Sequence, residues 1–294
     1  MLEEYRLYLQ ELDGKSLNTQ RIYTRVLNEF FAYFKIENMA DIISLKASSL
    51  RVYRQTFVEK GNSNVTINTT FNILKAFFSW LYQNEMIDEN PFKRIKGLKE
   101  AKKVRDFLTD DECKQVIAAV TGQTKVVFLL ALYAGLRREE LANVRIGDVR
   151  DGRILVHGKG KKERLLILHP SVAQELYNHI EKRREDEEFY SNIRGREAED
   201  HVFVSSRGGH GVTPESIRCW IKESLVAANL PPERVEVLST HCVRHSSATR
   251  MLSAGAEIGM VQQFLGHSSQ NTTRIYAHTL SSLVDGAVLG VKGL

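Results

Sequence analysis

Residues 239–279 read STHCVRHSSATRMLSAGAEIGMVQQFLGHSSQNTTRIYAHT, and the rest of the chain is organised around them. At about 100° per residue, His241, Arg244 and His245 share one helix face with apolar residues that would pack inward. A half-buried cation is costly without an anion, and a phosphate offers several charged acceptor oxygens at once. This face is therefore a candidate anion site.

Two further side chains extend this candidate site. Residues 257–265 predict a second helix that ends at Gly266, so His267 lies just past a helix end. Residues 271–278 suit a third short helix that carries Tyr276 about two turns later. The spacing allows these two side chains to converge with the basic face.

Two other interpretations of these residues stay open. The basic residues could form a satisfied ion-pair group, with Tyr276 as a core aromatic. A metal site is conceivable because His241 and His245 are four residues apart, but the segment HCVRH lacks the general-base glutamate of zinc hydrolases. We therefore expect no metal and no cofactor.

Composition sets the broad class of the protein. The chain has 294 residues, 43% of them hydrophobic, and a net charge of +5, so it has room for two domains and its charge permits a polyanionic partner. Its three cysteines are widely spaced, which favours a reducing cytoplasm over a disulfide framework. The longest apolar run, residues 126–136, is too short to cross a bilayer, so we expect a cytoplasmic protein with no membrane partner.

Residues 1–92 predict a helical domain that ends at Asn90-Pro91. Ser48 and Ser49 are candidate caps of one helix and Asn64 of the next. Polar side chains on the other helix faces are either solvated or are contacts to DNA phosphates and bases. The candidates for DNA binding are Arg21, Arg25, Asn68, Asn72 and Lys75.

Residues 93–106 predict a basic linker. It contains seven basic residues against the single acid Glu100 before residue 106: Lys93, Arg94, Lys96, Lys99, Lys102, Lys103 and Arg105. Such a segment is either a solvated tether or the part of a clamp that neutralises duplex phosphates, with Lys102 and Lys103 as candidate DNA contacts.

The domain over residues 107–294 opens with the capping box Thr109 to Glu112. An apolar helix over residues 125–134 follows, and Gly135 ends it. The next residues, LRREEL, present Arg137 at a helix-to-helix corner, with Glu140 one turn on and able to orient it. An ordinary surface ion pair is the alternative for this piece alone.

The pattern then changes to strands. Residues 153–157 and 164–168 predict a hairpin whose tip carries Lys159, Lys161 and Lys162 between and after glycines. The tip matches neither a P-loop nor GxGxxG. Helices are expected over residues 170–188 and 214–229, a strand over 201–205, and a solvated surface over the charge run 181–188.

With GLRREEL, the lysine hairpin, THCVRH, LGH and IYAH in this order, the chain resembles a tyrosine recombinase of the phage integrase and Xer type. The resemblance implies a mainly α fold with a small β-sheet, made of a helical, SAM-like core-binding domain and an α+β catalytic domain. It also implies six active-site positions, with Glu140 and His245 in support: Arg137, Lys159, His241, Arg244, His267 and Tyr276. Thr240 stands where the family often has proline.

The implied activity is site-specific recombination through a 3′-phosphotyrosyl intermediate, in chromosome-dimer resolution or mobile-element movement. The implied partner is double-stranded DNA at a recombination site, with self-association into a tetramer at paired sites and a second recombinase as an option. In this family the C-terminal tail, here residues 280–294, packs into a neighbouring protomer. A type IB topoisomerase and a non-catalytic DNA-binding relative are the alternatives.

Overall fold

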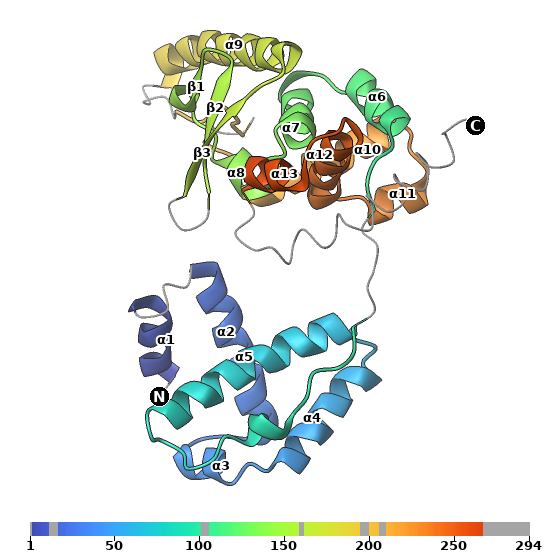
Figure 1. The fold of residues 1–294 in the computed structure, drawn as a ribbon. Coiled ribbons are helices and arrows are strands. Elements are labelled where there is room, and N and C mark those ends of the chain that lie inside the picture. Colours follow the sequence, from blue (N-terminus) through green and yellow to red (C-terminus); the bar gives the residue numbers. More distant parts are fainter. Residues whose placement is uncertain are drawn as a thin grey trace, which may run out of the picture. The chain divides into compact units, whose positions relative to one another are not determined.

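The computed structural model describes residues 2–11, 17–100, 106–158, 162–194, 200–205 and 210–266. It divides the chain into two units, Met1–Lys103 and Val104–Leu294 (Figure 1). Helices dominate both units, and the sheet present in the described residues has three short strands. This confirms the predicted fold class. Among the described residues, every helix is too short or too polar to cross a bilayer.

The secondary-structure elements of the first unit are all helices within its described residues. Its central helix is α5 (Asn64–Gln83), whose apolar stripe is buried against aromatic side chains from the neighbouring helices. Phe30, Tyr53, Phe78 and Phe92 meet with ring centroids 4.8 to 6.1 Å apart. The remaining elements are α1 (Leu2–Glu11), α2 (Leu17–Phe34), α3 (Met39–Ile43), α4 (Ala47–Glu59) and η1 (Pro91–Arg94).

Two predicted helix caps of this unit are wrong. Helix α4 begins at Ala47 after an extended Lys46, so Ser48 and Ser49 lie inside its first turn. Asn64 is the first residue of α5, and the hydroxyl of Ser63 accepts from the Thr66 amide at 3.2 Å. The preceding serine thus already satisfies the amide that an asparagine cap would have bound.

The start of the predicted linker packs on the first unit. The side chain of Asn68 donates to the Leu98 carbonyl and accepts from the Leu98 amide, both at 2.8 Å. Asn64 donates to the Lys99 carbonyl at 2.8 Å, and Arg54 to the Lys96 carbonyl at 2.9 Å. Residues 95–99 are therefore attached to α4 and α5 through their carbonyl and amide groups, while Lys96 and Lys99 are exposed. Lys102 and Lys103 lie outside the described residues.

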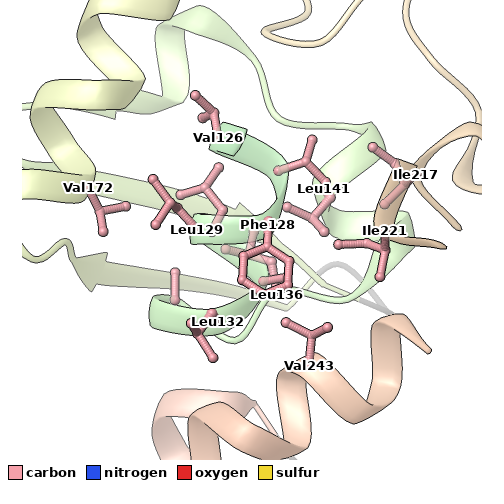
Figure 2. Close-up of a cluster of buried hydrophobic side chains, with 14 of the residues drawn as sticks. Val126, Phe128, Leu129, Leu132, Leu136, Leu141, Val172, Ile217, Ile221 and Val243 are labelled. Atoms are coloured by element: carbon pink, nitrogen blue, oxygen red, sulfur yellow. The ribbon is translucent and has the colours of Figure 1, made fainter. Parts of the chain in front are cut away.

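The second unit is built around α7 (Gly122–Tyr133), whose residues from Val126 to Leu132 are all buried. Side chains of three other helices converge on it, as Figure 2 shows for Val172, Ile221 and Val243. The other helices are α6 (Asp110–Ala119), α8 (Arg138–Ala142), η2 (Ile146–Asp148), α9 (Pro170–Arg194), α10 (Pro214–Ala227), α11 (Pro232–Val237), α12 (Thr240–Ser253) and α13 (Ile258–Leu265).

The sheet of this unit is antiparallel, in the order β1 (Val149–Arg150), β2 (Arg153–His157) and β3 (Glu163–Ile167). Strands β2 and β3 form the predicted hairpin, with His157 opposite Glu163 beside its tip. Ile154, Val156 and Leu166 bury one face in the core, while Leu165 and Ile167 are exposed on the other. The alternation sets which β3 side chains point inward.

Three sequence expectations for this unit differ from the structure. Residues 201–205 form isolated bridges, His201 with Arg145 and Val204 with Gly211, instead of a strand. Helix α9 continues to Arg194, beyond the predicted end at residue 188. Within the charge run that we expected to be solvated, Arg183 is buried because it faces the core side of α9.

Candidate active site

Arg137 lies where α7 turns into α8. Gly135 has a φ of +59°, and a Cβ there would come within 2.5 Å of the Leu265 side chain, so glycine is required at this corner. Arg137 follows in an extended conformation at the N-cap position of α8. The corner thereby holds the Arg137 backbone against the end of α13.

Glu140 is the acceptor at the centre of the site. Its carboxylate receives the Arg137 amide at 2.9 Å and Arg137 Nη1 at 2.7 Å, as the sequence predicted for this pair. It also receives Arg164 Nη1 at 2.9 Å and Nη2 at 2.8 Å. The side chain of Glu140 is 4% exposed, so these bonds act in a poorly solvated place.

The pKa of Glu140 reports the balance of these effects. Burial acts to raise it, but the hydrogen bonds from Arg164 and from the Arg137 backbone, together with the Arg164 charge, outweigh burial and lower it to about 2. Glu140 is therefore a carboxylate at any pH at which the protein works.

Arg244 enters the site from α12 and is buried. Its Nη1 donates to the Gly135 carbonyl and its Nη2 to the Leu265 carbonyl. Nη1 also lies 3.7 Å from Glu140 Oε2. The sequence predicted that a cation on this face would need a counter-charge, and Glu140 with the two carbonyls supplies it.

The C-terminal end of α13 binds three guanidinium groups. Its last carbonyls have no amide partner within the helix, and the helix dipole makes that end partly negative. Arg164 Nε donates to the Phe264 carbonyl at 3.1 Å, Arg244 to the Leu265 carbonyl, and Arg137 Nη2 to the Gly266 carbonyl at 3.1 Å. Gly266 has a φ of +63° and ends the helix as predicted.

Arg164 was not recognised from the sequence. It opens the predicted strand after the lysine tip and was given no role there, yet its side chain is only 14% exposed. The available signal was strand alternation. Arg164, Leu166 and Leu168 are two residues apart along the predicted strand, so their side chains lie on the same face, and if the leucines point into the core, Arg164 does too. A charged residue at an inward strand position indicates a buried partner.

The two histidines of α12 have different surroundings. His241 is exposed in the first turn of α12 and lies near Glu139. Burial raises the pKa of the Glu139 carboxyl, but the hydrogen bond from Arg138 and, to a smaller extent, the charge of His241 lower it below its ordinary value. His245 is buried, with its ring edge-on to Phe107 at 6.2 Å between centroids. His241 thus lies on the exposed side of α12 near α8, and His245 packs toward the start of the unit.

Lys159, Lys161, His267 and Tyr276 lie outside the described residues. The residues next to them are placed: the Gly158 amide donates to the Lys162 carbonyl at 2.7 Å and closes the hairpin, and Lys162 is exposed. A Cβ at Gly158 would lie 3.9 Å from both Arg164 Nη1 and Glu140 Oε1. The base of the lysine tip is therefore next to Glu140.

The predicted DNA contacts of the first unit fall into two groups. Arg21 and Arg25 on α2, and Asn72 and Lys75 on α5, are exposed. Asn68 is half-buried and uses its amide on Leu98 and on Glu100 Oε1, at 2.7 Å. Its role in this structure is to hold residues 95–100 on α5.

The chemistry of the site follows from its charges. Three guanidinium groups, those of Arg137, Arg164 and Arg244, surround one carboxylate, which leaves a formal charge of +2. Within the described ranges, no three His, Cys, Asp or Glu side chains are grouped as metal ligands would be. Fixed cationic donors around a partly exposed Arg137 are suited to bind an anion such as a phosphodiester.

Comparison with known proteins identifies the family. The profile described as "Phage integrase family" matches residues 106–282, and that of "Phage integrase, N-terminal SAM-like domain" matches residues 2–85. A tyrosine recombinase of Thermosipho africanus is 31% identical over 290 residues, which cover 95% of this chain and 94% of the relative.

Solved structures share the fold. A crystal structure of XerH site-specific recombinase bound to a palindromic difH substrate has a TM-score of 0.74 at 20% identity, covering 98% of this chain and 84% of that one. A lambda integrase tetramer bound to a Holliday junction has a TM-score of 0.68 at 18% identity, covering 93% and 75%. With its matched sequence, its fold and its arginine site, this chain belongs to the phage integrase family of tyrosine recombinases.

Proposed function

We propose that the protein cuts DNA strands at a specific site and rejoins them to new partners, with Tyr276 as the nucleophile. The observation that carries this proposal is the placement of Arg137 and Arg244 on one buried carboxylate and on the end of α13. His267 is the next residue after that helix end, and Tyr276 follows nine residues later. The segment that carries both residues therefore starts at Gly266, next to the point where the guanidinium groups converge.

Each residue type suits a step of phosphodiester attack. The phenolate oxygen of Tyr276 attacks phosphorus, the bond to the 5′ oxygen breaks, and a 3′-phosphotyrosyl link remains. Negative charge grows on the non-bridging oxygens, where Arg137, Arg244, His241 and His267 would donate hydrogen bonds. Nearby cations favour the ionised form of a phenol, whose reference pKa is about 10.

Lys159 is the proposed general acid. Its ammonium would protonate the leaving 5′ oxygen from the tip of the β2–β3 hairpin, whose base lies beside Glu140. The phosphotyrosyl link keeps the energy of the broken bond, so no nucleotide cofactor is required. A 5′-hydroxyl from another strand then reverses the attack and completes the exchange.

We also propose the setting of the reaction. Residues 1–92 would form the core-binding domain, residues 93–106 the linker and residues 107–294 the catalytic domain, with Arg21, Arg25, Asn72, Lys75, Lys102, Lys103, Lys161 and Lys162 on DNA phosphates. The lambda integrase tetramer bound to a Holliday junction and XerH bound to its difH substrate support a tetramer of this chain at paired, Xer-like sites. In that tetramer we propose that residues 280–294 are exchanged between protomers. Three free cysteines suit a reducing cytoplasm.

The substitution Tyr276→Phe tests the proposal. It removes one hydroxyl and no positive charge, so the covalent protein–DNA adduct should vanish while DNA affinity stays within about twofold. Tyr82→Phe, on the exposed side of α5, is the matched control and should form the adduct normally. Nicked suicide substrates drawn from the genome of the source organism would trap the adduct for denaturing electrophoresis. An adduct that persists in Tyr276→Phe refutes the assignment.

A second readout of the same experiment separates recombination from topoisomerase activity. Two duplexes, each with a trapped site, should exchange strands in the presence of the wild-type protein. Relaxation of supercoiled DNA at one site, with no dependence on a partner site, would instead assign the chemistry to a topoisomerase.

A further inference from the structure

Arg164 contacts two parts of the proposed site, although it is none of the six active-site positions. Its Nη1 and Nη2 donate one bond to each oxygen of Glu140, and its Nε donates to the Phe264 carbonyl of α13. All three guanidinium nitrogens of Arg164 thus donate to Glu140 or to the end of α13. With its side chain 14% exposed, Arg164 is far less open to a ligand than Arg137, at 32%.

These contacts fix the orientation of the Glu140 carboxylate. Oε1 receives Arg164 Nη1 and Arg137 Nη1, while Oε2 receives Arg164 Nη2 and the Arg137 amide. A paired, bidentate bond holds both oxygens in one plane, which a single ammonium does not do. The direction in which Arg137 leaves the α8 corner therefore depends on Arg164.

Arg164 also sets the charge that the site offers. Arg244 Nη1 is already 3.7 Å from Glu140 Oε2. Without Arg164, one carboxylate would face two guanidinium groups, and the formal charge would fall from +2 to +1. The carboxylate would then have acceptor positions turned toward Arg244, which would draw that side chain from its carbonyl partners on Gly135 and Leu265.

We propose that Arg164 is a positioning residue that orients Arg137 and Arg244 for the phosphate through Glu140 and the end of α13. This rests on the proposed function, since it gives those two arginines the scissile phosphate as ligand. Arg164 itself makes no contact with DNA in this role. Its loss should slow the chemical step and leave binding unchanged.

Arg164→Gln is the test variant and Arg153→Gln the matched control. Arg153 is an arginine of the same sheet, is exposed on β2, and loses the same charge when substituted. Single-turnover cleavage of a suicide substrate would be measured at saturating protein, beside the affinity for the same duplex. Tryptophan fluorescence of Trp220 in a Trp80→Phe background would report whether the second unit is folded.

The cleavage rate of Arg164→Gln should fall about 10- to 100-fold, by analogy with the loss of a residue that orients a metal ligand. Its affinity for DNA should stay within about twofold of wild type, and Arg153→Gln should cleave normally. A substrate with sulfur at the 5′ bridging position leaves without protonation, so it should not restore the rate if the defect lies in the arginine clamp. Arg164→Lys should be slow as well, because it cannot bind both carboxylate oxygens.

Three results would overturn the proposal. The first is a cleavage rate of folded Arg164→Gln within twofold of wild type, and the second is a fall in cleavage rate that weaker DNA binding explains entirely. The third is full rescue by the sulfur substrate, which would place the defect at the lysine hairpin. If Arg164→Gln does not fold, Arg164→Lys is judged by the same criteria, and failure of both to fold would show a purely structural role. Wild type and Tyr276→Phe in the same assay separate this outcome from failure of the proposed function, because that failure would remove the dependence of the adduct on Tyr276.

Discussion

Substituting Glu140 with glutamine should destabilise the second unit, and the lowered pKa of Glu140 gives the expected loss of folding free energy. The carboxyl has an ordinary pKa of 4.5 and a pKa of about 2 in the folded protein. At about 1.4 kcal/mol for each pH unit, this difference corresponds to about 3 kcal/mol of folding free energy at pH 7. Removing one partner of a buried ion pair costs about 3–5 kcal/mol in other proteins, which agrees with this magnitude.

The pH dependence has a definite sign. Because the folded pKa is lowered, the stability that Glu140 contributes is complete above pH 4.5 and is lost as the pH falls toward about 2. Glutamine does not titrate. The difference in unfolding free energy between wild type and Glu140→Gln should therefore be constant between pH 7 and about pH 5.5, and should shrink below pH 4.5.

Urea unfolding of the full chain measures this difference. The sequence has two tryptophans, Trp80 in the first unit and Trp220 in α10, so a Trp80→Phe background makes fluorescence report on the second unit. Glu215→Gln is the matched control, because Glu215 pairs with Arg218 on the surface of the same unit and its loss should change little. A Glu140→Gln protein as stable as wild type, or a difference that persists unchanged to pH 3.5, would refute the reasoning.

Three further predictions concern the reaction and DNA binding. Arg137→Ala should cleave roughly 10²–10³ times more slowly, as for loss of one donor to a developing oxyanion, and a wild-type single-turnover rate would contradict the clamp. Lys159→Ala should be slow on ordinary DNA and recover on the 5′ sulfur substrate, and absence of recovery argues against a general acid. Lys162→Ala loses a proposed phosphate contact and no proton donor, so the sulfur substrate should not relieve any slowing in that variant. Replacing Arg21 and Arg25 together with glutamine should reduce the slope of log affinity against log salt by about 2, and an unchanged slope in filter binding would show that these side chains are merely solvated.

Local spacing predicted the parts of the site that lie within one turn of the chain. Arg137 and Glu140 are three residues apart across a helix start, so their pairing followed from helix geometry. The end of α13 at Gly266 and the hairpin around the lysine tip followed from turn chemistry in the same way.

Contacts between distant segments were beyond that reasoning. Arg164 meets Phe264, a hundred residues later in the chain, and no local pattern indicates which helix end a strand will face. The attachment of residues 95–99 to α4 and α5 was missed for the same reason, since lysines dominate the segment while its carbonyls and apolar side chains make the contacts. Composition described the surface of that segment and not its packing.

The use of a helix end to hold the arginines explains how the site keeps its positive charge. Three buried or half-buried guanidinium groups need acceptors, and a second or third carboxylate would satisfy them by neutralising them. Carbonyls at the end of α13 accept three of their hydrogen bonds and contribute only about half a negative charge in total. Glu140 then supplies the one full counter-charge that burial demands. The protein thereby satisfies the hydrogen bonds of the arginines while the excess positive charge remains for a phosphate. Glycine suits position 266 because its φ is +63° and a Cβ there would lie 3.1 Å from Arg164 Nη1.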